Sequence, residues 1–218
     1  MTERSYVECT ASCLMALREV QGRYPSVLRK PLGKAIEDAR RFLLDSQNQD
    51  GTWEAAWGVR YIYATMFGVR GLLAAGVPRT DPRIRRACEW LLTHQRADGG
   101  WGERQSSASL PEYVAADASS SVQTAWALIT LAEAGEPDEQ ALARAAAYLD
   151  AEQLDSGEGP DGLFVGVFFE TALLNYRLYR QYFPVMALAL HERAVAGRVL
   201  PGRTHASTTP ASRPRATA

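Results

Sequence analysis

The chain of 218 residues contains no uncharged apolar run that approaches the roughly 20 residues of a membrane span. Contact with one leaflet through an apolar patch stays open. The chain also lacks an excess of charge of either sign, because 24 basic and 25 acidic residues leave a formal net charge of −1. A nucleic-acid partner bound by bulk electrostatic attraction is therefore not expected.

Cysteine and histidine are scarce. The three cysteines are an odd number, and Met1-Thr2-Glu3-Arg4 shows no signal-peptide pattern, so we expect a reducing cytoplasm. The three histidines, His94, His191 and His205, are scattered along the chain. No grouped set of zinc ligands accompanies Cys88, and we expect no metal site.

The most informative pattern in the sequence is a motif that occurs twice. It consists of a helix-like run, a glutamine, three residues, a glycine, one residue and a tryptophan. The two copies are Gln47, Gly51 and Trp53 and, 48 residues later, Gln95, Gly99 and Trp101. A fixed period of this length indicates a supersecondary unit that is repeated along the chain.

The residues of this motif indicate a structural role. A glycine after a helix adopts the left-handed conformation that ends it, and Asp-Gly favours a turn. A glutamine amide can pair backbone groups at the helix end, and tryptophan buries a large ring while its N–H finds an acceptor. We therefore interpret each copy as a clamp between one helix and the next element. The clamp supplies no catalytic group.

Helical periodicity dominates the rest of the chain, and alternating strand patterns are scarce. The turn signals Gly76-Val77-Pro78, Gly135-Glu136-Pro137 and Phe183-Pro184 separate the predicted helices. Helices are predicted at about 5–22, 31–46, 60–75, 82–95, 117–134, 138–152, 167–180 and 183–197. The pattern predicts an all-α fold built from helical hairpins.

Three segments depart from this pattern. Residues 103–118 are rich in Ser, Ala and turn formers and predict a long loop. A third, altered clamp is expected from Gln153, with Phe164 in place of the tryptophan. Residues 198–218 have the composition of a disordered tail, which leaves one domain over residues 1–197.

The clamps resemble the QW repeats of the triterpene cyclase family, which includes squalene-hopene cyclases and oxidosqualene cyclases of the lanosterol synthase type. Further stretches resemble the C-terminal part of the oxidosqualene cyclases and follow one another in the order of that family. They are 5–10 (Ser-Tyr-Val-Glu-Cys-Thr), 57–59 (Trp-Gly-Val), 98–103 (Asp-Gly-Gly-Trp-Gly-Glu), 124–128 (Thr-Ala-Trp-Ala-Leu), 166–168 (Gly-Val-Phe), 174–176 (Leu-Asn-Tyr), 179–180 and 183–184.

The resemblance implies a partial α/α toroid, or α6-α6 barrel, whose other half lies N-terminal in longer relatives. Enzymes of this family fold a linear C30 isoprenoid, squalene or oxidosqualene, in an apolar cavity and cyclise it without a cofactor. A carboxylic acid starts the reaction, and aromatic rings stabilise the carbocation.

The resemblance also assigns roles to individual residues. Cys9 matches the cysteine that hydrogen-bonds the catalytic acid, while Trp57 and Phe168 match aromatics of the cavity. Trp126 matches a tryptophan near the cavity that we do not assign to catalysis. The competing interpretation for Cys9, Trp57 and Phe168 is ordinary core packing.

A match to the acid is not found in the sequence. In the family the acid lies upstream of the Val-Glu-Cys-Thr stretch, and the chain begins at Met1, immediately before it. Asp45, Asp50 and Asp98 lie in turn contexts, and Glu8 belongs to a helix face. We therefore expect the chain to be inactive alone and to pair with an N-terminal half or with itself.

Two other functions stay open at this stage. A non-catalytic α/α toroid could keep the half-cavity to bind a lipid or a protein. A toroid of the protein prenyltransferase β type would need zinc held by Asp, Cys and His, which this sequence does not group. The location we expect is the cytoplasm or the surface of a membrane.

Overall fold

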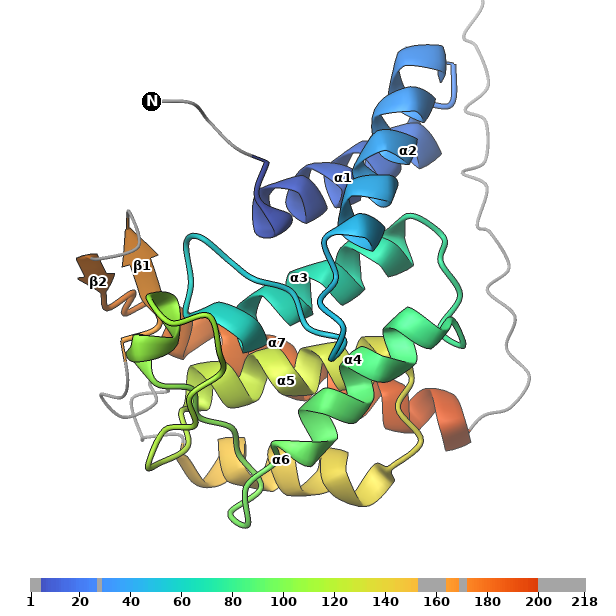
Figure 1. Cartoon of the computed structure of the whole chain (residues 1–218). Coiled ribbons are helices and arrows are strands. Elements are labelled where there is room, and N and C mark those ends of the chain that lie inside the picture. Colours follow the sequence, from blue (N-terminus) through green and yellow to red (C-terminus); the bar gives the residue numbers. More distant parts are fainter. Residues whose placement is uncertain (1–4, 27–28, 153–163, 169–171, 200–218) are drawn as a thin grey trace, which may run out of the picture.

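The computed structural model describes residues 5–26, 29–152, 164–168 and 172–199 (Figure 1). Within these residues the chain is mainly helical, as the periodicity predicts. The elements are α1 (Val7–Arg23), α2 (Arg29–Asp45), α3 (Arg60–Ala74), α4 (Pro82–Thr93), the 3-10 helix η1 (Gln105–Ala108), α5 (Ser121–Ala134), α6 (Glu139–Glu152), β1 (Gly166–Phe168), β2 (Ala172–Leu174) and α7 (Tyr179–Val199).

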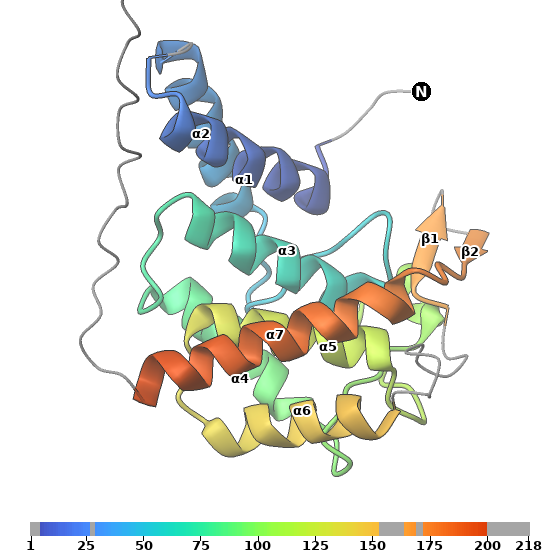
Figure 2. The same cartoon turned by 180° about the vertical axis from the view of Figure 1, so that it is seen from behind.

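The helices alternate between two layers. The inner row is formed by α1, α3, α5 and α7, in which each helix packs against the next (Figures 1 and 2). The outer helices α2, α4 and α6 each pack on the inner helix that precedes them in the chain. Successive helices therefore form hairpins, and the odd-numbered member of each hairpin lies inside.

Burial follows from this arrangement. All but one of the 14 residues of α5 are buried, because α3, α6 and α7 cover it from different sides. The outer helix α4 buries one face only, with Ile84, Cys88 and Leu91 one turn apart. Because α5 is covered on all sides and α4 on one, the sequence of α5 is an apolar run and that of α4 is amphipathic.

The two clamps form the same local structure. The Gln47 side chain donates through Nε2 to the backbone oxygens of Gly51 and Arg83, both at 2.9 Å. The Gln95 side chain donates to the oxygens of Gly99 at 2.9 Å and Ala141 at 2.8 Å. One clamp therefore joins the end of α2 to α4, and the other joins the end of α4 to α6.

The tryptophans complete the clamps. Trp53 Nε1 donates to the oxygen of Leu43 at 2.7 Å, and Trp101 Nε1 donates to the oxygen of Leu91 at 2.8 Å. Both rings are fully buried. Each indole N–H thus pairs a carbonyl in the last turn of the preceding helix, where carbonyls lack helical partners.

The clamp glycines are required by geometry. Gly51 has φ +97° and Gly99 has φ +90°. A Cβ at Gly51 would lie 2.7 Å from the carbonyl carbon of Arg86, and one at Gly99 would lie 2.4 Å from the oxygen of Arg144. A side chain would be strained at either position and would separate two outer helices.

The predicted helix at 167–180 is wrong. Residues 166–174 contain the antiparallel strands β1 and β2, with Val167 opposite Leu173. Gly58 pairs with Gly166, so β1 also borders the segment that precedes α3. Short apolar runs do not distinguish a strand from a helix, and here pairing with a distant segment decides the outcome.

The turn signals have different outcomes. Gly76 and Gly135 follow α3 and α5 and end them, as predicted. Pro184 does not separate two helices but lies inside α7, in the second turn. It removes the N–H that would otherwise donate to the carbonyl of Arg180 one turn earlier.

The remaining predictions concern a loop, a clamp and a tail. Residues 94–120 join α4 to α5 and contain η1, in agreement with the predicted long loop. Gln153 of the altered clamp and most of the predicted tail lie outside the described residues, whereas Phe164, the expected replacement for the clamp tryptophan, is 43 % exposed and not buried as Trp53 and Trp101 are. No helix among the described residues is long and apolar enough to cross a membrane.

Candidate functional site

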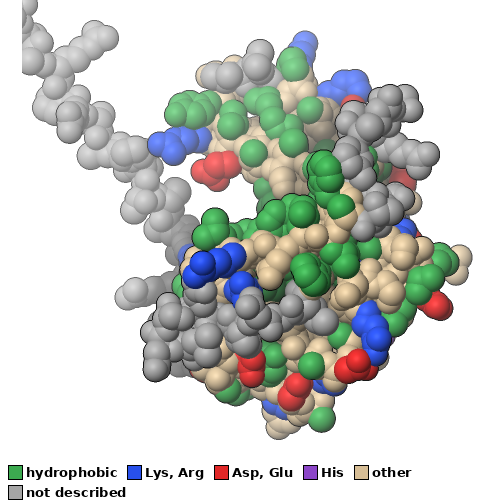
Figure 3. Space-filling model, turned by 90° about the vertical axis from the view of Figure 1, so that its left-hand side faces the viewer, with side chains coloured by type: hydrophobic (Ala, Val, Ile, Leu, Met, Phe, Trp, Pro, Cys, Tyr) green, Lys and Arg blue, Asp and Glu red, His purple; other side chains and the backbone are tan. Residues whose placement is uncertain are grey.

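An apolar hollow of about 480 Å³ lies along α1 and α2. Figure 3 shows hydrophobic side chains around a hollow on the side of the molecule that faces left in Figure 1. The lining side chains come from both helices and from the segment that precedes α3. They are Ser5, Tyr6, Cys9, Thr10, Cys13, Leu14, Leu17, Ala35, Ala39 and Trp57.

Cys9 lies on the face of α1 that borders the hollow. It is exposed, as is Cys13 one turn later, whereas Val7 and Ala11 of the opposite face are buried. Packing in the core is excluded for Cys9, because its side chain borders open space.

Trp57 and Phe168 lie together. Their ring centroids are 5.6 Å apart, and the centroid of the Tyr6 ring lies 6.2 Å from that of Trp57 in an edge-on contact. Phe168 is 40 % exposed, so its ring is not part of the core. The structure thus brings Cys9, Trp57 and Phe168 to one side of the molecule, although 159 residues separate the first from the last.

The tryptophan that the resemblance places near the cavity without a catalytic role lies elsewhere. Trp126 on α5 is fully buried. Its ring contacts Tyr63 at 4.8 Å and Phe183 at 5.6 Å, which places it between α3 and α7. Trp126 is a core residue of the inner row, consistent with leaving it out of the catalytic set.

The backbone of the Trp57 segment is held by a buried carboxylate that sequence reasoning missed. Glu8 is 3 % exposed, and its Oε1 accepts hydrogen bonds from the N–H groups of Ala56 and Trp57, both at 2.8 Å. The expectation that Glu8 is simply part of a helix face is incomplete. Nothing in its sequence neighbourhood signals an acceptor role 49 residues away.

A second buried carboxylate lies at the start of α3. Glu103 accepts from the N–H groups of Arg60, Tyr61 and Ile62 at 3.0–3.2 Å. A carboxylate is favourable at this end of a helix, where free N–H groups and the macrodipole present positive charge. Burial nevertheless raises the pKa of Glu103 to about 7, against the opposing effect of these hydrogen bonds.

Neither carboxylate lines the hollow. Both are occupied by backbone N–H groups of residues 56–62. For the hollow itself, its described lining contains no carboxylate.

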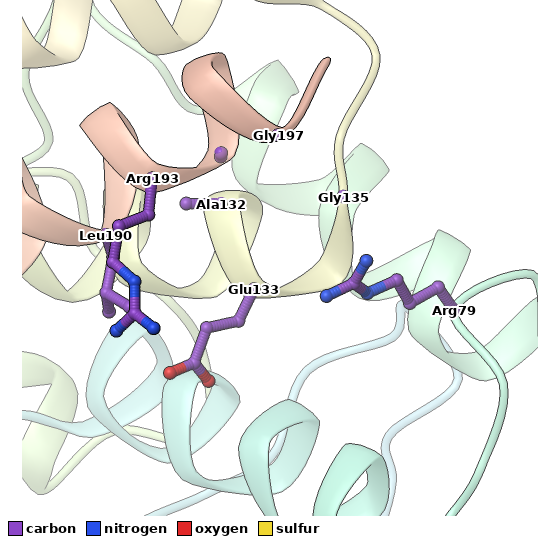
Figure 4. Close-up of a pocket in the computed structure, with 8 residues that line it drawn as sticks. Arg79, Ala132, Glu133, Gly135, Leu190, Arg193 and Gly197 are labelled. Carbon is purple, nitrogen blue, oxygen red and sulfur yellow. The ribbon is translucent and has the colours of Figure 1, made fainter. Parts of the chain in front are cut away.

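A second hollow, of about 350 Å³, lies between α5 and α7 (Figure 4). Figure 4 shows Glu133 of α5 between Arg79 and Arg193, which come from different elements. Glu133 already pairs with Arg70 at 3.0 Å. The hollow borders the C-terminal end of α5, where helix carbonyls disfavour an anion, and we assign no ligand to it.

Metal ligands are not grouped in the described part of the chain, where no three His, Cys, Asp or Glu side chains come together. Cys88, the cysteine of the zinc alternative, is fully buried in α4. Burial raises the pKa of its thiol to about 12, which disfavours the thiolate that a metal would bind.

Comparison with known proteins supplies the family. The profile of the squalene-hopene cyclase C-terminal domain matches residues 2–193 of the chain. The chain belongs to the squalene-hopene cyclase family. It is 36 % identical to lanosterol synthase of Candida albicans over 202 residues and 34 % identical to lanosterol synthase of Homo sapiens over 210 residues.

The family resemblance extends to the bacterial enzymes. A probable squalene-hopene cyclase of Sinorhizobium fredii is 37 % identical over 185 residues. The matches cover 92 %, 93 % and 84 % of the chain but only 28 % of each relative. The cyclase domain therefore spans less than a third of the length of these curated relatives.

Solved structures show the same fold. The ent-copalyl diphosphate synthase of Streptomyces platensis matches with a TM-score of 0.63 at 24 % identity, over 90 % of the chain and 34 % of that protein. The type II terpene cyclase MstE of Scytonema matches with a TM-score of 0.57 at 18 % identity, over 90 % and 57 %. The α/α toroid architecture predicted from the sequence is confirmed for this cyclase domain.

Proposed function

We propose that the chain forms the C-terminal part of a triterpene cyclase that acts on a linear C30 isoprenoid, squalene or oxidosqualene. The observation that carries the proposal is the position of Cys9 and Trp57 on one apolar hollow, with the Phe168 ring 5.6 Å from Trp57. The whole-length relatives named above include lanosterol synthases and a probable squalene-hopene cyclase. Their activities are the basis for the substrate class.

The chemistry of cyclisation fits such a surface. A carbocation is trapped by water, so its cavity must be dry and lined by weak nucleophiles. The faces of aromatic rings attract a desolvated cation by roughly 0.5–2 kcal/mol each. Trp57 and Phe168 would supply two such rings, with the orientation fixed before the charge develops.

The acid that starts the reaction is proposed to come from outside this chain. Glu8 and Glu103, the buried carboxylates near the Trp57 segment, are engaged with backbone N–H groups and do not border the hollow. Cys9 is exposed on the hollow and is proposed to hydrogen-bond the incoming acid. In isolation the chain is therefore expected to be inactive.

An N-terminal half would also cover exposed apolar surface. Leu178, immediately before α7, and Tyr182 and Val185 in its first two turns follow one another at helical spacing and are 65 %, 46 % and 56 % exposed. A stripe of this kind is typical of a surface that another polypeptide covers. Self-association and contact with a membrane surface are the competing uses, and the cytoplasm is the proposed location.

Co-expression tests the proposal. The chain is expressed with the N-terminal part of an oxidosqualene cyclase that carries the acid, and the pair is assayed with squalene and oxidosqualene. We expect cyclised product from the pair and none from either part alone. Trp57→Ala should lower the rate at least about tenfold or change the products, whereas Tyr24→Ala, an exposed aromatic outside the hollow, should do neither.

Two results would contradict the proposal. Product formed by the isolated chain would disprove the need for an external acid. A stable pair that forms no product from either substrate would favour the non-catalytic alternative, in which the half-cavity binds a lipid or a protein.

A further inference from the structure

The segment that carries Trp57 has an unusual set of hydrogen-bond acceptors. Between residues 56 and 62, five backbone N–H groups donate to only two side chains, Glu8 and Glu103. Glu8 receives two of them and Glu103 receives three. The two carboxylates come from distant parts of the chain, one from α1 and one from the loop that follows the second clamp.

Between the two carboxylates the segment is joined to β1. The Val59 N–H donates to the oxygen of Val165 at 2.9 Å, and the Val167 N–H donates to the oxygen of Trp57 at 3.2 Å. The peptide groups on both sides of Trp57 are thus fixed. The N–H is held by Glu8 of α1, and the carbonyl is held by β1, which also carries Phe168.

Because the two carboxylates are buried, the loss of one of these hydrogen bonds would be energetically costly. Glu8 is 3 % exposed and Glu103 is fully buried, so water does not replace them readily as acceptors. A buried N–H group without an acceptor is costly, because it has lost its hydration without gaining a partner. Each carboxylate therefore specifies one local conformation of the backbone that it holds.

The structure assigns Glu8 and Glu103 a joint role as positioning residues, which hold residues 56–62 so that the Trp57 ring faces the hollow beside Phe168. The geometric part of this inference stands on the hydrogen bonds alone. Its consequence for cyclisation rests on the proposed function. A displaced Trp57 ring would no longer lie where the carbocation develops on the substrate, and would stabilise it less.

The two carboxylates differ in a way that a substitution can test. Only Oε1 of Glu8 accepts, and Oε2 is buried without a partner among the described residues. Both oxygens of Glu103 accept, Oε1 from the N–H of Arg60 and Oε2 from the N–H of Ile62. An amide in place of Glu8 can keep its accepting oxygen, whereas an amide in place of Glu103 must present an NH₂ group to at least one N–H donor.

Amide hydrogen exchange on the isolated chain tests the geometry. Glu8→Met and Glu8→Gln both remove the charge and keep a similar volume, but only Gln keeps an acceptor. We expect the amides of Ala56 and Trp57 to exchange at least about tenfold faster in Glu8→Met and at the native rate in Glu8→Gln. Glu103→Gln should accelerate at least one of the amides of residues 60–62. Amides of α5 should be unaffected throughout.

Native exchange at residues 56 and 57 in Glu8→Met would overturn the inference, as would faster exchange that extends through α5. Equal loss in Glu8→Gln would also overturn it, because the acceptor would then not be the decisive atom.

The reconstituted pair supplies the second measurement. Glu8→Met should shift the products toward incompletely cyclised compounds, and Glu8→Gln should restore the native pattern. Unchanged products in Glu8→Met would refute the consequence for cyclisation. If the native pair forms no product, the proposed function fails, while the exchange rates still decide the positioning role.

Discussion

The carboxylate of Glu8 accepts a hydrogen bond of 2.8 Å from the backbone N–H of Trp57, 49 residues further along the chain. This hydrogen bond fixes the backbone at Trp57 relative to the first helix, α1. Cys9 is the next residue after Glu8 and borders the same hollow as Trp57. A single turn of α1 thus contributes both an anchor for the aromatic and a thiol beside it.

The clamp tryptophans should contribute to stability through their N–H groups. Trp53→Phe and Trp101→Phe each remove the buried indole N–H that donates to a carbonyl of the preceding helix, that of Leu43 or Leu91. We expect each to lower the free energy of unfolding in urea by about 1–3 kcal/mol. The two effects should add, because the two indole N–H groups donate to carbonyls of different helices, Leu43 of α2 and Leu91 of α4.

Trp57→Phe is the matched control for these two substitutions. Its ring is only partly buried and lies on the hollow, so we expect a change of less than about 1 kcal/mol. An equal loss in all three variants would show that ring volume, not the N–H, is what the clamps require.

The clamp glycines should be intolerant of a side chain. Gly51→Ala and Gly99→Ala combine a positive φ with backbone atoms closer than 3 Å to the new Cβ. We expect each to destabilise the chain by about 2 kcal/mol or more. Gly33 lies inside α2 with nothing within 4 Å of a Cβ, so Gly33→Ala should stabilise by about 0.5–1 kcal/mol.

Thermal and urea unfolding of these three variants would show which of them lower and which raise the free energy of unfolding. A neutral Gly51→Ala would contradict the close approach of the clamp to α4. Destabilisation by Gly33→Ala would show that the helix at that position is not formed in solution.

Patterns that depend on local sequence were predictable. The clamps follow from Asp-Gly turns after apolar helical runs, and the structure forms both with the same partners. Most helices were predicted within a few residues because their apolar periodicity reports which face the neighbours cover. The hollow itself, with Cys9 beside Trp57, was predictable only through resemblance, because periodicity does not say which distant faces meet.

Features set by distant pairing were not predictable. The strands β1 and β2 are three residues each and exist because β1 joins residues 57–59. The burial of Glu8 and Glu103 likewise depends on N–H groups 41–49 residues away. A carboxylate on a helix or in a loop normally predicts solvent exposure, so only the folded chain shows that these two act as acceptors.

The three thiols should differ in reactivity. Cys9 and Cys13 are exposed on the hollow, whereas Cys88 is fully buried with the pKa of its thiol raised to about 12. We expect an alkylating reagent at neutral pH to modify two thiols in the native chain and the third only after unfolding, as measured by intact mass. Cys13→Ser should leave one reactive thiol. Rapid labelling of Cys88 in the folded chain would contradict the packing of α4.

The exposed stripe on α7 should control assembly. Val185→Glu places a charge in the stripe, so we expect it to weaken a complex with the N-terminal half at least about tenfold by a binding titration. The unfolding free energy of the isolated chain should change by less than about 0.5 kcal/mol, since Val185 is 56 % exposed. Val195→Glu is the control, because ten residues along a helix turn the side chain about 80° away. Equal weakening by both would argue against a specific interface at the stripe.

Glu103 should make stability depend on pH with a sign opposite to that of most carboxylates. Its pKa is about 7 in the folded chain against 4.5 for an unperturbed glutamate, so the folded state binds more protons between these values. The free energy of unfolding should therefore fall as pH rises from about 4.5 to about 7, by up to about 3 kcal/mol, and level off above that. Glu103→Gln removes the titrating group, and the difference between the two pH profiles isolates its contribution. A difference that is flat across this window, or that rises with pH, would mean that the N–H groups of α3 outweigh burial and hold the carboxylate ionised.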